Sequence, residues 1–188
     1  MFNLVSLDGF FAGSDGNIDW FMVDSEFDRW AAESVDEFDT VLLGRTTYEL
    51  FAGYWPGALT NPETPDEDLV VARALDDMTK VVFSRSLERA DWRNTEFWRE
   101  IEPQEIKKLR EQPGKVIVVY GSGTIVSQLT NLGLIDEYRL LVNPVILGSG
   151  KPLFEDVEKT AMKLLDTRTF ESGNVLLRYQ PAEAPTPG

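Results

Sequence analysis

The chain has 188 residues, 43% hydrophobic and 11% aromatic, which is typical of one folded domain. It carries 32 acidic and 18 basic residues, a formal charge of −14, so nucleic acids and anionic membranes are poor partners for its surface. Cysteine and histidine are both absent, which excludes disulfides, thiolate chemistry, Ser-His-Asp triads and His-ligated zinc, and we expect no metal.

The beginning of the chain lacks a basic segment followed by a long apolar one, so no signal peptide is predicted. The apolar runs are far shorter than the ~20 residues that span a bilayer. We therefore expect a cytoplasmic protein.

The first half of the chain alternates short apolar runs with amphipathic segments. Asp8-Gly9 ends the first run as a turn, and Asp24-Ser25 is suited to cap the first helix. The predicted elements here are strands at residues 4–7, 41–44 and 80–83, helices at 24–38, from 46 or 47 to about 51, and 66–77, and loops at 12–17 and 53–65.

The second half continues the alternation and then ends differently. The run at 116–120 is the most apolar and β-branched of the chain, and the last two strands are joined around Ser172-Gly173 as a hairpin. The predicted elements here are strands at residues 94–98, 116–120, 137–142, 162–170 and 174–180, and helices at 103–112 and 124–132.

This order of elements predicts an α/β fold, a three-layer αβα sandwich with a mainly parallel central sheet and a C-terminal antiparallel hairpin. Residues 1–180 form one predicted domain. Residues 181–188 contain three prolines and no core residue, so we expect a flexible C-terminal tail.

Three apolar strands end in small or polar residues where a helix or turn begins. In open α/β sheets, ligands bind beyond the carboxyl ends of the strands, where helix N-termini offer free N–H donors to anions. These strand ends are Gly44-Arg45-Thr46-Thr47, Ser84-Arg85-Ser86 and Gly121-Ser122-Gly123-Thr124.

Each strand end has a simpler interpretation when it is considered alone. A Gly-Ser-Gly turn often only reverses the chain, and Arg45 or Arg85 could pair with a surface carboxylate. Their coincidence at three strand ends, in a chain with 18 basic residues, favours an anion-binding site.

Several motifs resemble one known family over residues 2–180. They resemble the family that joins dihydrofolate reductases to the reductase domain of bacterial riboflavin-biosynthesis deaminase/reductases, and in particular its small stand-alone bacterial members. The motifs are Ser6-Leu7-Asp8-Gly9, Leu43-Gly44-Arg45-Thr46-Thr47-Tyr48-Glu49, Val82-Phe83-Ser84-Arg85, Val119-Tyr120-Gly121-Ser122-Gly123, Gly133-Leu134-Ile135-Asp136-Glu137 and Pro144-Val145-Ile146-Leu147-Gly148-Ser149-Gly150-Lys151-Pro152-Leu153-Phe154.

The resemblance implies a dihydrofolate-reductase-like sandwich and NADPH as cofactor. It also implies hydride transfer to a small heterocyclic substrate, pterin-like or pyrimidine-like, and a homodimer. The turns at Gly44–Thr47 and Gly121–Thr124 would contact the cofactor phosphates, and Ser84-Arg85 would contact the 2′-phosphate, which a planar guanidinium can pair with twice.

On the substrate side, the resemblance implies that Asp28 contacts the ring and that Asp8 lies beside the substrate and nicotinamide. Asp28 could equally belong to the solvent-exposed face of its helix, and Asp8 is also suited to an Asp-Gly turn. Trp30 could stack on a ring but is better explained as core. We find no basic cluster for the ribityl phosphate of riboflavin precursors, and the deaminase half is missing, so a role in riboflavin biosynthesis is doubtful.

Two other functions remain open at this level. The protein could be a non-catalytic module that binds a nucleotide or flavin, since the sequence offers no obvious acid or base. It could also be a scaffold whose glycines only make turns.

Overall fold

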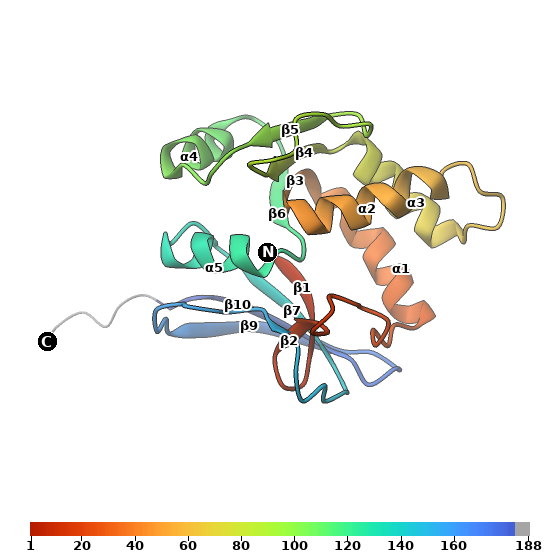
Figure 1. Ribbon diagram of the computed structural model, residues 1–188. Helices are drawn as coiled ribbons and strands as arrows, with labels where there is room; N and C mark the ends of the chain where they lie inside the picture. Colours follow the sequence, from red (N-terminus) through yellow and green to blue (C-terminus); the bar gives the residue numbers. More distant parts are fainter. Residues whose placement is uncertain (183–188) are drawn as a thin grey trace, which may run out of the picture.

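A computed structural model describes residues 1–182, in which a twisted sheet lies between two layers of helices (Figure 1). The helices are α1 (Ser25–Ser34), α2 (Arg45–Ala58), α3 (Asp66–Asp77), α4 (Pro103–Glu111) and α5 (Gly123–Asn131), with a 3-10 turn η1 (Val35–Glu37). The strands are β1 (Phe2–Ser6), β2 (Phe10–Ala12), β3 (Phe38–Gly44), β4 (Thr79–Phe83), β5 (Thr95–Trp98), β6 (Val116–Val119), β7 (Tyr138–Asn143), β8 (Lys151–Pro152), β9 (Met162–Thr169) and β10 (Val175–Pro181).

The sheet consists of two four-stranded halves, in the orders β5-β4-β3-β6 and β1-β7-β10-β9. An isolated parallel bridge between Phe2 and Tyr120 joins β1 to the end of β6 and thus one half to the other. The pairs β1–β7, β3–β4, β3–β6 and β4–β5 are parallel, and β10 pairs antiparallel with both β7 and β9. The predicted parallel sheet with a C-terminal antiparallel hairpin is therefore confirmed.

Strand β3 shows how the core is divided between the two faces of the sheet. Leu42 packs on one face with residues of α4 and α5, whereas Val41 and Leu43 pack on the other with residues of α2 and α3. This alternation follows from the opposite directions of successive side chains in a strand. Helix α1 covers the second half-sheet, where Phe27 packs against Leu141 of β7.

Two predicted boundaries were wrong. Helix α1 ends at Ser34, and Phe38 begins β3, where it pairs with Val116 of β6. Helix α2 continues to Ala58 through a segment predicted as a loop from residue 53, although Pro56 removes one backbone donor. Trp55 packs against the core on this turn, and tertiary packing of this kind outweighs weak helix propensity.

The described part of the chain ends shortly after β10. Pro181 is the last residue of this strand, one residue beyond the predicted domain boundary. The rest of that prediction, from residue 183, lies outside the described residues.

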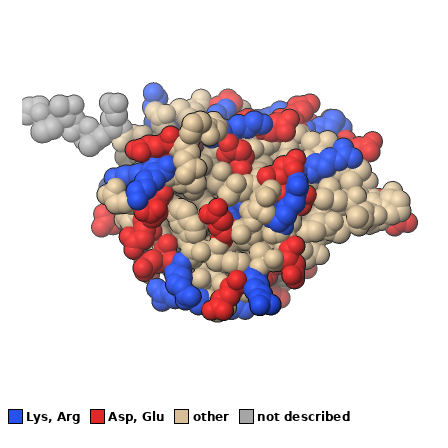
Figure 2. All heavy atoms as spheres, turned by 90° about the horizontal axis from the view of Figure 1, so that it is seen from above, with Lys and Arg blue, Asp and Glu red and all other residues tan. Residues whose placement is uncertain are grey.

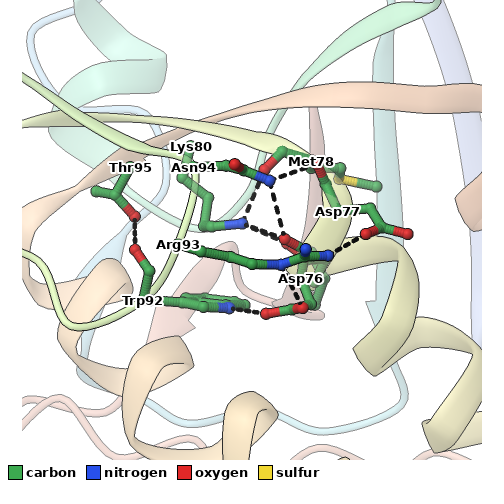
Figure 3. Close-up of polar contacts among 9 residues, drawn as sticks. Asp76, Asp77, Met78, Lys80, Trp92, Arg93, Asn94 and Thr95 are labelled. Carbon is green, nitrogen blue, oxygen red and sulfur yellow. Dashed lines mark hydrogen bonds and ion pairs between the residues drawn. The ribbon is translucent and has the colours of Figure 1, made fainter.

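Lys80 of β4 is fully buried and anchors the end of α3 (Figure 3). Its Nζ donates to the carbonyl oxygens of Leu75 at 2.6 Å and Met78 at 2.8 Å, and lies 4.4 Å from the centre of the Trp92 ring. Leu75 lies in the last turn of α3 and Met78 is its C-cap residue, so a cation here is favoured by the helix dipole. Burial lowers the pKa of Lys80 to about 8, against the attraction of Asp76, so the ammonium still prevails at neutral pH.

Acidic and basic side chains lie interspersed on the face drawn in Figure 2, where Lys and Arg neighbour Asp and Glu rather than forming a basic patch. Among residues 1–182, none of the helices combines the length and the apolar character needed to cross a bilayer.

Candidate active site

A cavity of about 610 Å³ lies where the two half-sheets meet, with walls from both halves and from helices α1, α2 and α3. Most of its lining is apolar, and many of the side chains are aromatic. Such a volume and lining suit a ligand with planar rings. The aromatic residues that line it are Phe2, Phe11, Phe21, Phe27, Trp30, Phe38, Phe51, Trp55, Phe83 and Tyr120.

The cavity brings together nine of the twelve residues predicted for the site. They are Asp28, Gly44, Arg45, Thr46, Thr47, Gly121, Ser122, Gly123 and Thr124. The other three, Asp8, Ser84 and Arg85, do not line it.

Ser122 ties two of the predicted strand ends together. Its Oγ accepts a hydrogen bond from the Gly44 N–H at 2.8 Å and lies 2.9 Å from Thr47 Oγ1 and 3.0 Å from the Tyr120 carbonyl oxygen. The ends of β3 and β6 and the first turn of α2 are thus held at fixed separations. A ligand would meet this wall already formed, which lowers the ordering cost of binding.

Gly121 and Ser122 both adopt the left-handed conformation, with φ of 54° and 59°. The space beside Gly121 is occupied by the protein itself, because an added Cβ would lie 2.9 Å from Thr47 Oγ1. The glycine therefore serves first to let the β6 turn pack against α2.

The N-termini of α2 and α5 both open into the cavity and differ from those of the other α-helices. Neither has a side-chain cap or an acidic residue in its first turn. By contrast, the Asp24 carboxylate caps α1, and α3 and α4 carry acids in their first turns. First-turn N–H groups lack partners within their own helix and carry a partial positive charge. This edge of the sheet is therefore suited to bind an anion.

The remaining strand end, after β4, forms a turn of its own beside the end of β3. Ser84 is buried, and its Oγ accepts hydrogen bonds from the N–H groups of Ser86 and Leu87. Arg85 is exposed. Arg45 Nη1 donates to Ser86 Oγ at 2.9 Å, so this turn lies next to the start of α2.

Asp8 lies in a tight turn outside the cavity lining. Its carboxylate accepts hydrogen bonds from the Ser6 hydroxyl at 2.7 Å and from the N–H groups of Leu147 and Gly148. The Ser6 hydrogen bond, more than any other interaction, lowers the pKa of Asp8. These contacts give Asp8 a structural role in joining the loop after β1 to the loop after β7.

Asp28 faces the cavity from α1 and accepts no side-chain hydrogen bond from residues 1–182. Partial burial raises the pKa of its carboxyl, and the nearby carboxylates of Asp68 and Glu67 raise it further. A carboxyl of this kind gains from a hydrogen-bond donor or a cation on a ligand. Trp30 packs among Phe2, Phe27 and Phe170 and so belongs to the core, as predicted, while also reaching the cavity.

Three charged residues in the cavity wall were not predicted: Asp68 of α3, Arg139 of β7 and Lys151 of β8. Asp68 accepts a hydrogen bond from the Tyr54 hydroxyl, and Arg139 is held by Glu37 and Glu137. Lys151 lies in the Gly-Ser-Gly-Lys-Pro motif, which was the one sequence signal that could have indicated it.

The fold and the cavity define an α/β domain of the reductase type. Residues 1–176 match the RibD C-terminal domain, and the chain belongs to that family. The uncharacterized protein YyaP of Bacillus subtilis (strain 168) is 38% identical over 176 residues, which cover 93% of this chain and 90% of YyaP.

Solved structures share the fold at low sequence identity. A putative riboflavin biosynthesis protein from Shewanella sp. PV-4 gives a TM-score of 0.71 at 19% identity, with 97% of each chain covered. Dihydrofolate reductase from Enterococcus faecalis, complexed with NADP(H), gives a TM-score of 0.62 at 14% identity, with 97% of this chain and 95% of the reductase covered.

Proposed function

We propose that this protein is an NADPH-dependent reductase that transfers hydride to a pterin-like or pyrimidine-like ring. The observation that carries the proposal is the pair of helix N-termini, α2 and α5, that open into one cavity without a cap or a first-turn acid. In a chain of net charge −14, such a site is suited to the pyrophosphate of a dinucleotide. The NADP(H) in the Enterococcus faecalis structure supports this choice.

The residues of the cavity fit NADPH as follows. The first-turn N–H groups of α2, near Thr46 and Thr47, and those of α5, near Gly123 and Thr124, would donate to the phosphates. When bound, NADPH would supply the hydride that reduces a C=N or C=O bond of the ring. The protein would orient both rings between aromatic walls and exclude water from them.

The substrate half of the proposal depends on Asp28 and on the charges around it. Arg139 is already paired with Glu37 and Glu137, and Arg45 lies on the cofactor side, at the start of α2. An aromatic cavity in which Asp28 accepts no hydrogen bond from residues 1–182 favours a planar ring with N–H donors over a phosphorylated substrate.

Nicotinamide fluorescence during titration with NADPH tests the proposal. We expect saturable binding, followed by cofactor oxidation when a panel of dihydropterins and reducible pyrimidines is added. Absence of binding at high micromolar NADPH overturns the proposal. Binding without oxidation across the panel would favour the alternative, a non-catalytic nucleotide- or flavin-binding module, which a co-purified chromophore would support further.

Removal of Arg85 or Arg45 is expected to discriminate between the two nicotinamide cofactors. Arg85 is the proposed partner of the 2′-phosphate, and Arg45 lies beside it because its Nη1 donates to Ser86 Oγ. Arg85→Ala and Arg45→Ala should therefore each raise the Kd for NADPH by about 10-fold or more, through loss of charge-assisted contacts to that phosphate. The Kd for NADH, which lacks that phosphate, should change little. Fluorescence titration with both cofactors measures the ratio, and Arg73→Ala, an exposed arginine of α3, is the control. Equal loss for both cofactors would contradict a 2′-phosphate site here.

Replacing Asp28 with asparagine is expected to change stability and activity in opposite directions. The pKa of Asp28 is raised, so its charge disfavours the fold once the pH exceeds its folded-state pKa. Asp28→Asn should therefore raise the free energy of unfolding at pH 7 by less than about 1 kcal/mol, seen as a slightly higher Tm. The same change should lower kcat/KM at least about 10-fold. Glu33→Gln, an exposed change on the same helix, is the control. Unchanged turnover in Asp28→Asn would remove Asp28 from the site.

We also propose that the protein is a homodimer. The apolar side chains of Met162, Leu164 and Leu165 on the edge strand β9 are 37%, 49% and 41% exposed. Exposed apolar side chains on a sheet edge favour association with a second copy, and sedimentation analysis distinguishes monomer from dimer.

A further inference from the structure

Lys151 enters the cavity wall from a backbone that is fixed on both sides. It belongs to β8, where Lys151 pairs with Ala12 and Pro152 pairs with Phe10 of β2. The N–H of the following residue, Leu153, donates to the Gly9 carbonyl oxygen at 3.2 Å. The base of the side chain is thus held in place, although the side chain itself is exposed at the rim of the cavity.

The ammonium of Lys151 differs from the other cations of the cavity in its lack of a partner. Arg45 pairs with Glu49, and Arg139 with two glutamates. Within residues 1–182, Lys151 Nζ has no ion pair and donates no hydrogen bond. Lys151 attracts the Asp15 carboxylate through space without an ion pair, and that carboxylate accepts hydrogen bonds from the backbone and side-chain nitrogens of Asn17, both at 3.0 Å.

The loop opposite Lys151 leaves room for this ammonium. Gly16 has a φ of 89°, and a Cβ added there would lie 3.0 Å from Lys151 Nζ. Gly16 also lines the cavity. A side chain at Gly16 would therefore push the Lys151 ammonium away from its present position.

The strand that carries Lys151 also lies against the start of α5. A Cβ added to Gly123 would be 3.2 Å from the Pro152 carbonyl oxygen, so the residue beside Lys151 packs on the first residue of the helix. Gly123 and Lys151 both line the cavity. An unpaired ammonium and an uncapped helix N-terminus thus belong to one wall.

We propose that Lys151 binds a phosphate of the dinucleotide and acts as an affinity-determining residue on the cofactor side. The inference rests on the proposed function, which supplies the dinucleotide. An ammonium is a compact point charge on a flexible stem, and it can follow a phosphate oxygen while its backbone stays fixed. The contact would give the acidic protein a specific cation for a multiply charged anion, in the part of the cavity wall formed by the loop at 12–21 and α5.

Three variants test the role of Lys151: Lys151→Met, Lys151→Arg and Lys107→Met, the last an exposed lysine of α4 that does not line the cavity. Each is titrated with NADPH at low and moderate salt, and with inorganic pyrophosphate as competitor. Thermal unfolding verifies that all three fold. We expect Lys151→Met to raise the Kd for NADPH about 10-fold, to reduce its salt dependence, and to weaken competition by pyrophosphate. Lys151→Arg should retain most of the affinity, and Lys107→Met should resemble the wild type.

The outcomes separate this inference from the proposed function. If wild-type protein binds NADPH and Lys151→Met binds it equally well with the same salt dependence, only the role of Lys151 is overturned. If wild-type protein binds no NADPH, the proposed function fails, and the role of Lys151 fails with it. An equal loss of affinity in Lys107→Met would mean that the effect is one of net charge, and would also overturn the inference.

Discussion

Lys80→Ala is expected to lower the free energy of unfolding by about 4 kcal/mol, the sum expected for emptying a buried site and leaving polar partners unsatisfied. The ammonium occupies the centre of a polar cluster in which Trp92 Nε1 also donates to Asp76 Oδ1 at 2.9 Å (Figure 3). Without Lys80, the carbonyls of Leu75 and Met78 face a cavity. Urea unfolding measures the loss. Lys107→Ala, at an exposed position of α4, should change the free energy of unfolding little.

The pH dependence of the same site distinguishes packing from charge. Because the pKa of Lys80 is lowered to about 8 from 10.5, the unfolded chain binds this proton more tightly than the fold does. Stability contributed by the wild-type side chain should therefore rise as the pH increases between these values. Compared with Lys80→Met, which keeps most of the volume, the wild type should gain stability from pH 8 to pH 10. If the stability of the wild type relative to Lys80→Met fell over this pH range, the attraction of the ammonium to the carbonyls and to Asp76 would outweigh the cost of burying its charge.

Gly121→Val is expected to lower stability by about 3 kcal/mol, through a left-handed backbone that a β-branched residue rarely adopts and through overpacking. Its Cβ would lie 2.9 Å from Thr47 Oγ1 and would separate the β6 turn from α2. That turn also carries Ser122, whose hydroxyl accepts from the Gly44 N–H. Cofactor binding should therefore weaken about 10-fold or more in the molecules that remain folded.

A matched glycine of α2 provides the control for this prediction. A Cβ added to Gly53 meets no atom within 4 Å, and its φ is not positive. Gly53→Val should therefore leave both the Tm and the Kd for NADPH close to the wild-type values. If Gly121→Val retained the wild-type stability and the wild-type affinity for NADPH, the glycine at this turn would not be needed for binding, as the scaffold interpretation holds.

Local patterns predicted those parts of the molecule that depend on local physics. The alternation of apolar strands and helices predicted the sheet, Asp24 was predicted as a cap and accepts the Phe27 N–H at 2.8 Å, and two strand ends meet in the cavity as parallel topology requires. These features depend on periodicity, on short-range hydrogen bonds and on strand direction, all of which can be inferred from neighbouring residues.

Features that depend on the exact path of the backbone and on the direction of a side chain could not be predicted in this way. The Lys80 ammonium is satisfied by the end of another element, α3. Ser84 turns its hydroxyl towards its own loop, and only coordinates show that Arg85 lies outside the cavity lining while Lys151 lies within it. Helix α2 continues past Gly53 because Trp55 packs against the core. The sequence around these positions does not reveal in which direction these side chains point.

The two half-sheets are connected by the isolated bridge between Phe2 and Tyr120, and both of these residues line the cavity. Phe2 and Leu4 contribute to the cavity from one half-sheet, and Gly44 and Tyr120 contribute from the other. A molecule bound in the cavity would therefore contact both half-sheets at once. Ligand binding is therefore expected to stabilise the contact between the two half-sheets together with the folded state.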